Sequence, residues 1–212
     1  MASDMSLDLF MMCRTLSESA CTQLPDGYHL RGCRRDELEL WKAMPFDDVE
    51  TAQRHADYMT AYFRDVYADQ ADLFFRSCVF VCDAADQPIG TCFAWRAYGA
   101  VTTLHWFKII KPYEGRGLGR ALLSHVLRSI PAQDFPVFLH TQLGSFRAIK
   151  LYADFGFSFL TEATIGHRQN HWVQCRPLLA QLVPAEVFAG LRTTMAPDFF
   201  LTAAASSPIH QF

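Results

Sequence analysis

The spacing of apolar residues changes repeatedly along the chain, between compact β-rich runs and a three-to-four repeat. The compact runs predict strands at 28–32, 77–82, 89–97, 101–110, 136–141, 157–161 and 170–175. The three-to-four repeat predicts helices at 34–44, 47–66, 118–130, 146–155 and 184–192. Residues 7–12 fit either a short amphipathic helix or a terminal tail. The pattern indicates one mixed α and β domain with an extension at each end.

A run of alternating glycines lies between the strand at 101–110 and the helix at 118–130. Gly115, Gly117 and Gly119 occupy this strand-to-helix turn. Glycine accepts a positive φ and lets a bound group approach the backbone closely. The first amides of a helix lack intrahelical partners and carry the positive end of its dipole. The turn is therefore expected to cradle an anion, most simply the pyrophosphate of a coenzyme; the plain alternative is a tight turn with no ligand.

Two other phosphate-binding motifs do not fit this turn. A Walker loop would end in Gly-Lys-Ser/Thr, whereas Gly119 is followed by Arg120 and Ala121. A dinucleotide fingerprint would have the spacing Gly-x-Gly-x-x-Gly early in a βαβ unit. The glycine run therefore needs a different explanation.

Composition places the chain among globular proteins. Of 212 residues 50% are hydrophobic and 14% aromatic, and the formal net charge is -3. These values exclude bulk disorder and give no reason to expect nucleic acid or an acidic membrane as partner. The seven cysteines are odd in number and form no Cys-x-x-Cys pair, so we expect buried reduced thiols and no zinc site. Asp4 and Asp8 argue against a secretory signal, and a cytoplasmic location without a membrane span is expected.

A second motif follows the glycine turn at 139–157. It contains Ser145, Ala148, Leu151, Tyr152, Gly156 and Phe157. This segment resembles the Asn/Ser-x-x-Ala-x-x-Leu-Tyr-x-x-x-Gly-Phe motif of the GNAT superfamily, the Gcn5-related N-acetyltransferases. The order of predicted elements over 28–176 is similar to that family as well.

The resemblance implies a fold and a division of the chain. The expected fold is α+β, a three-layer α/β/α arrangement around a mixed, mostly antiparallel and twisted sheet of about seven strands. Its fourth and fifth strands would part in a V, as in the acyl-CoA N-acyltransferase fold. The implied domain covers 26–176, preceded by an N-terminal extension at 1–25. A C-terminal extension at 177–212 would pack on the domain or on a partner subunit, which allows a homodimer.

Acetyl-CoA is the co-substrate that the resemblance implies, with no metal. By the resemblance, acetyl-CoA would be bound by Ile109 and Ile110 at the end of the fourth strand, by the glycine turn, and by the 145–152 segment. The predicted coenzyme-binding residues are Ile109, Ile110, Gly115, Arg116, Gly117, Leu118, Gly119, Arg120, Ser145 and Tyr152. Arg116 and Arg120 would add charge-assisted contacts to phosphate, or they are simply solvated surface charges. Ser145 stands where many members have a coenzyme-contacting Asn, although it also fits an N-cap.

Tyr152 would donate a proton to the departing CoA thiolate, as the family's tyrosine at this position does. The alternative is a core tyrosine on an amphipathic helix. His105 and Glu162 are candidates for the base that deprotonates the amine, with a structural histidine as the alternative for His105. Positioning and desolvation without a dedicated base would also serve.

One residue departs from the family pattern. Glu114 replaces the usual Gln or Arg and puts a carboxylate near the expected pyrophosphate; Lys111 and Arg116 offer compensating charge. The sequence therefore predicts an N-acetyltransferase acting on a primary amine, more simply a small molecule than a peptide. A catalytically silent acyl-CoA-binding or regulatory module, and an O-acyl or longer-acyl transferase, stay open.

Overall fold

The computed structural model describes residues 5–212, so Asp4 and the rest of 1–4 lie outside the described residues. Eight strands form one mixed sheet in the order β10-β7-β1-β6-β5-β4-β3-β2. Their bounds are β1 Asp8–Cys13, β2 His29–Gly32, β3 Val79–Cys82, β4 Pro88–Ala97, β5 Val101–Ile109, β6 Val137–Gln142, β7 Ser158–Leu160 and β10 Thr193–Thr194. The predicted α+β class with a mixed sheet is confirmed.

The described chain divides into two compact units, and each is described by itself. The glycine-turn unit comprises 21–95 and 104–130, and the terminal unit comprises 5–20, 96–103 and 131–212. The long strands β4 and β5 contribute residues to both units.

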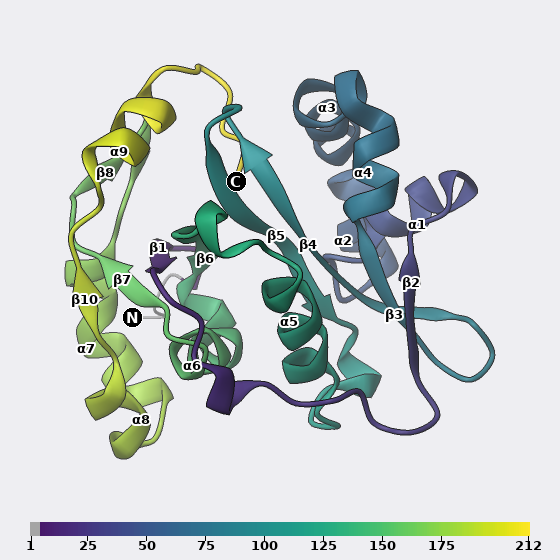
Figure 1. Ribbon diagram of the computed structural model, residues 1–212, viewed down its shortest axis with the longest axis horizontal. Coiled ribbons are helices and arrows are strands. Elements are labelled where there is room, and N and C mark those ends of the chain that lie inside the picture. The colour runs from purple at the N-terminus through teal and green to yellow at the C-terminus, as the bar shows by residue number, and fades with distance from the viewer. Residues whose placement is uncertain (1–4) are drawn as a thin grey trace. The chain divides into compact units, whose positions relative to one another are not determined.

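Helices and strands of the glycine-turn unit enclose an aromatic core. The helices are α1 Leu38–Ala43, α2 Val49–Arg54, α3 Ala56–Val66, α4 Ala71–Ser77 and α5 Leu118–Arg128. The first four gather beside β2 and β3 (Figure 1). Trp41, Tyr67 and Phe74 are fully buried, and the Trp41 and Phe74 rings lie 4.9 Å apart. Such edge-to-face packing stabilises a core beyond the apolar area that it buries.

The predicted helix at 47–66 proves to be two helices that meet at His55. Asp48 caps the first of them, because its carboxylate accepts a hydrogen bond from the Thr51 amide at 2.8 Å. Val49, the first apolar residue of the predicted helix, is 73% exposed. A surface helix of six residues buries little, so the apolar repeat alone did not fix its orientation.

In the terminal unit an N-terminal strand lies inside the sheet, between β7 and β6. β1 pairs antiparallel with β6 from Asp8↔Gln142 to Cys13↔Val137 and also pairs antiparallel with β7. The expected helix or tail at 7–12 is therefore wrong. Residues 9–13 are all buried, and a run that is apolar on both faces has no period that separates a strand from a helix.

The expected strand at 170–175 is also wrong, because this segment begins a helix. The C-terminal helices are α7 Trp172–Leu182, α8 Ala185–Gly190 and α9 Asp198–Ala205, and they follow α6 Phe146–Asp154 and the small β8 Thr164–Ile165 and β9 Arg168–Gln169 pair. Trp172, Cys175 and Leu179 are buried at helical spacing. α7 continues through the predicted boundary at 176–177. β10 pairs parallel with β7, and α8 lies next to α7 (Figure 1).

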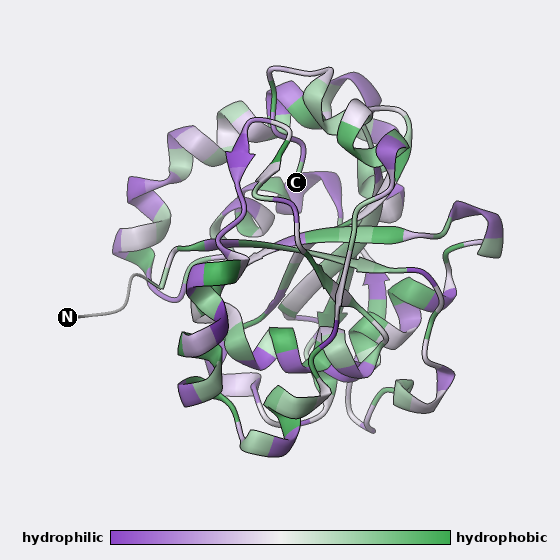
Figure 2. Ribbon diagram, turned by 90° about the vertical axis from the view of Figure 1, so that its left-hand side faces the viewer, coloured by the Kyte–Doolittle hydropathy of each residue, from purple (hydrophilic) through white to green (hydrophobic). Residues whose placement is uncertain are grey.

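β5 pairs parallel with β6 at Thr102↔Val137 and Thr103↔Phe138. This short pairing fits two strands that lie side by side only at their first residues. Figure 2 shows long hydrophobic stretches on the strands and hydrophilic residues mainly on helices and loops.

All seven cysteines are free, as expected, and all but the half-buried Cys21 are buried. Burial raises the pKa of the Cys13 thiol to about 11, so it stays protonated at neutral pH. Within residues 5–212, no helix is both long and apolar enough to cross a bilayer.

Candidate functional site

The glycine turn links β5 to α5 in the glycine-turn unit. After β5 a short 3₁₀ turn at Lys111–Tyr113 leads to Gly115 and Gly117, whose φ angles are 75° and 80°. Gly117 is the N-cap residue of α5, and the first intrahelical bond runs from the Ala121 amide to the Gly117 carbonyl at 3.1 Å. Amides that precede Ala121 in the helix have no intrahelical acceptor, which is the geometry of an anion cradle.

Space above the turn is open. A Cβ built on Gly115 meets no atom within 4 Å, and one built on Gly117 meets only Pro25 Cγ, at 3.9 Å. The two glycines are therefore required for their positive φ and not to avoid a clash. The open space and the amides fit a phosphate group.

Arg116 is exposed but held in place. Its guanidinium donates to the Tyr28 hydroxyl at 3.1 Å and to the Pro112 carbonyl at 3.0 Å. It also lies over the Tyr113 ring, 4.9 Å from the centroid. Arg120 is half-buried, and Glu114, the departure from the family pattern, is exposed.

His105 is buried on β5, with 2% of its surface exposed, in the same unit. Its Nδ1 shares a hydrogen bond with the Tyr67 hydroxyl, which also accepts from Trp106 Nε1 at 3.0 Å. Burial lowers the pKa of His105 to about 3, so the imidazole is neutral at physiological pH. The next residue, Trp106, has a φ of 52°, a strained value for an aromatic residue within a strand.

Tyr152 and Ser145 belong to the terminal unit. Tyr152 lies on α6 with 6% of its surface exposed, and its ring is 5.8 Å from that of Phe157. Ser145 occupies the N-cap position of α6, but its side chain makes no capping bond, contrary to expectation. Gly156 follows the end of the helix and has a φ of 98°, which suits a glycine at this position.

Glu162 lies in the same unit and holds the chain that enters α9. Its Oε1 accepts from the Ala196 amide at 2.9 Å, and its main-chain carbonyl accepts from Asn170 Nδ2. Its Oε2 is buried and has no hydrogen-bond partner among the described residues. The carboxylate therefore performs a structural task; its role as a base stays a prediction.

Sequence reasoning missed a polar cluster formed by residues of β1, β6 and β9. His140 Nε2 donates to Asp8 Oδ1 at 2.8 Å, and Arg168 Nη2 donates to the same oxygen at 3.2 Å. Burial alone would raise the pKa of Asp8, but the bond from His140 and the charge of Arg168 lower it to about 2. Burial lowers the pKa of His140. The three residues are 28 to 160 positions apart, so only strand pairing could reveal the cluster.

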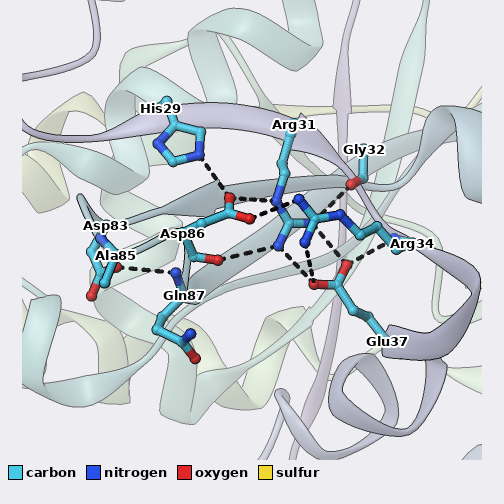
Figure 3. A network of polar contacts seen from close by, with 9 residues as sticks. All are labelled: His29, Arg31, Gly32, Arg34, Glu37, Asp83, Ala85, Asp86 and Gln87. Atoms are coloured by element: carbon cyan, nitrogen blue, oxygen red, sulfur yellow. Dashed lines mark hydrogen bonds and ion pairs between the residues drawn. The ribbon is translucent and has the colours of Figure 1, made fainter.

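His29, Cys82 and Asp86 are close enough together to be considered as metal ligands. Figure 3 shows why they do not suit a cation: Arg31 and Arg34 already contact the Asp86 carboxylate, each at 2.7 Å. Burial also raises the pKa of the Cys82 thiol to about 11, so the thiolate that a metal needs is disfavoured. The group serves as an ion-pair network.

The sequence at 39–157 matches the model of the acetyltransferase (GNAT) family, and this region contains the glycine turn and Tyr152. The chain belongs to the GNAT acetyltransferase family. No match was found among curated proteins.

A solved GNAT structure shows a similar fold, and a second is similar over part of the chain. A tandem GNAT protein from the clavulanic acid biosynthesis pathway is 15% identical, with a TM-score of 0.52, over 73% of this chain and 50% of that chain. A GCN5-related N-acetyltransferase from Sphaerobacter thermophilus is 20% identical, with a TM-score of 0.49, over 73% of this chain and 49% of that one. The GNAT chain therefore spans about half the length of these solved chains. At such identities the likeness is one of fold.

Proposed function

We propose that this GNAT protein is an acetyl-CoA-dependent N-acetyltransferase that acts on the primary amine of a small molecule. The observation that carries the proposal is the glycine turn: two glycines at positive φ, an open space above them, and the N-terminus of an 11-residue helix. Family membership supplies the expectation that acetyl-CoA is the ligand.

The turn would bind the coenzyme pyrophosphate through the amides of 115–120, with Arg116 and Arg120 adding positive charge. The main chain at Ile109 and Ile110 would accompany the pantetheine arm. Oriented amides at a helix N-terminus suit this task, because they need no reorganisation when the anion arrives.

The proposed reaction is direct acetyl transfer. The amine nitrogen bonds to the thioester carbonyl carbon, the carbon–sulfur bond breaks, and the sulfur leaves as a thiolate that receives a proton from Tyr152. The proton lost by the amine passes to a base or to water. Neutral His105 and the anchored Glu162 are the two candidates for the base, and positioning of a neutral amine is the simpler alternative.

Titration calorimetry with acetyl-CoA tests the proposal, with wild type beside Gly117→Glu, which adds a carboxylate to the turn. We expect micromolar binding by wild type and loss of binding in the variant, because the added charge repels phosphate. Release of free CoA thiol across a panel of small amines then tests transfer. An acetyl-CoA affinity equal in both proteins would refute the proposed cradle.

A silent acyl-CoA-binding or regulatory module is the second candidate, and the exposed Glu114 favours it. This carboxylate stands where the family pattern has Gln or Arg, and it would weaken phosphate binding. Acetyl-CoA binding with neither hydrolysis nor transfer to any amine would support this candidate. Glu114→Gln separates the two candidates, since it should tighten acetyl-CoA binding in either case but raise the rate of transfer at subsaturating acetyl-CoA only in an enzyme.

A further inference from the structure

The Arg116 side chain is fixed before any ligand arrives. Two of its N–H groups donate to the Tyr28 hydroxyl and the Pro112 carbonyl, and its Cζ lies over the Tyr113 ring. The Tyr28 ring meets the Tyr113 ring edge to face, with centroids 6.4 Å apart and planes at 84°. A surface arginine without such supports would sample many rotamers.

Arg116 takes part in no ion pair within the described residues. None of the carboxylates in residues 5–212 forms an ion pair with it, and both of its hydrogen-bond partners are neutral oxygens. A guanidinium has five N–H donors, so most of its capacity is left for an anion. Arg116 lies between Gly115 and Gly117, in the middle of the turn that we propose binds pyrophosphate.

Tyr113 is itself anchored from a different part of the chain. Its hydroxyl donates to Asp83 Oδ2 at 3.1 Å. The other carboxylate oxygen of Asp83 accepts from the amides of Ala85 and Gln87 at 2.9 and 3.0 Å, a turn visible in Figure 3. These bonds to backbone amides lower the pKa of Asp83, which keeps the carboxylate ionised.

Ion pairs hold the loop that carries Asp83. Arg31 forms a bidentate pair with Glu37 at 2.6 and 2.7 Å, and its Nε donates to Asp86 at 2.7 Å (Figure 3). Arg34 adds a second contact to the Asp86 carboxylate. The bidentate pair with Glu37 fixes the Arg31 guanidinium, and Arg31 in turn donates to the carboxylate and the carbonyl of Asp86. The 83–87 loop is therefore a firm support for the Tyr113 phenol.

We infer that Asp83 and Tyr113 are positioning residues that hold the Arg116 guanidinium ready for a phosphate oxyanion of the coenzyme. The inference rests on the proposed function, since it assumes that the turn binds acetyl-CoA. Its physical basis is pre-organisation: an arginine already fixed by a ring and two hydrogen bonds loses little freedom when it meets phosphate. Neither Asp83 nor Tyr113 belongs to the glycine motif.

A double-mutant cycle on acetyl-CoA affinity tests the inference with Arg116→Gln and Tyr113→Leu. We expect Arg116→Gln to weaken binding about tenfold, the typical effect of losing a charged hydrogen bond. Tyr113→Leu should weaken binding about three- to tenfold in wild type and cause no further loss in the Arg116→Gln background. KM for acetyl-CoA should rise while kcat at saturation stays unchanged.

Milder and matched variants complete the design. Tyr113→Phe keeps the ring and removes only the bond to Asp83, so its loss should be about two- to threefold. Arg64→Gln removes an exposed arginine of α3 and should leave affinity unchanged. An equal effect of Tyr113→Leu in both backgrounds would overturn the inference, because Tyr113 would then act on the turn and not through Arg116.

Two ligands identify the phosphate. If Arg116→Gln weakens acetyl-CoA and its 3′-dephospho analogue equally, the guanidinium serves the pyrophosphate; a loss confined to acetyl-CoA assigns it to the 3′-phosphate. Both results support the inference, and no loss with either ligand overturns it. Failure of wild type to bind acetyl-CoA would refute the proposed function and the inference together, whereas binding without coupling refutes the inference alone.

Discussion

Replacing Gly117 by alanine gives the sharpest test of the glycine turn. Its φ of 80° lies in the left-handed region, where a Cβ costs about 1–2 kcal/mol. The nearest atom to the new methyl is Pro25 Cγ at 3.9 Å, an ordinary contact, so no steric term is added. Alanine also reduces the entropy of the unfolded chain, which returns about 0.4–1 kcal/mol. The net loss of stability should be about 1 kcal/mol.

This loss is small enough to leave the protein folded. For a chain of this size it lowers Tm by about 2–4 °C. The effect on the ligand should be larger, because relief of the strain turns the amides of the turn away from a common centre. Losing one charged hydrogen bond costs about 1.5–3 kcal/mol, so acetyl-CoA affinity should fall about 10- to 100-fold.

Gly99→Ala is the matched control. Gly99 has a φ of 65°, and a Cβ there meets nothing within 4 Å, so the two substitutions should cost similar stability. Scanning calorimetry gives Tm for both variants, and titration calorimetry gives their affinity for acetyl-CoA. Comparable stability loss with unchanged acetyl-CoA affinity in Gly117→Ala would show that the amides of the turn do not bind the coenzyme.

Three further predictions concern single side chains. Tyr152→Phe should lower kcat about 100-fold and leave the Kd for acetyl-CoA unchanged, and equal turnover would remove Tyr152 from the mechanism. The lowered pKa of Asp8, about 2, means that its ionised form stabilises the fold above about pH 4 and that this stabilisation is lost as pH falls towards 2. In Asp8→Asn the free energy of unfolding should therefore decrease less between pH 4 and pH 2 than in wild type, by about 1–2 kcal/mol after allowance for solvent screening. Parallel pH curves for the two proteins would contradict the lowered pKa of Asp8. His105, with a pKa of about 3, should show a neutral imidazole by NMR throughout pH 5 to 8. In the unfolded chain the same imidazole is protonated below about pH 6.5, so the free energy of unfolding should fall as pH drops below that value. A titration midpoint of His105 within pH 5–8 would be inconsistent with its burial.

Local patterns in the sequence were sufficient to predict the glycine turn and most strands. Gly115 and Gly117 adopt the positive φ angles that alternating glycines predicted, and the helix after them buries Leu118, Leu122 and Val126 as its repeat required. The reason is that turn conformation and helix amphipathicity depend on residues a few positions apart. The same short-range signals, in the right order, also indicated the GNAT family.

Long-range contacts decided the elements that these local patterns did not predict. Residues 9–13 are apolar at every position, so only their place between β6 and β7 made them a strand. Residues 172–175 are helical although the sequence around Trp172 favours β structure. The wider spacing of Trp172, Cys175 and Leu179 carried the helical signal.

Polar contacts between distant segments were likewise decided by tertiary structure. Nothing near Tyr113 in the sequence points to Asp83, 30 positions earlier, and nothing near His140 points to Asp8. Hydrogen bonds of this kind depend on side chains that the fold brings together, whereas a sequence pattern records only neighbours along the chain. The sequence by itself therefore determined the glycine turn at which we propose that this GNAT protein binds an anion, and the tertiary structure decided which residues hold the Arg116 side chain in that turn.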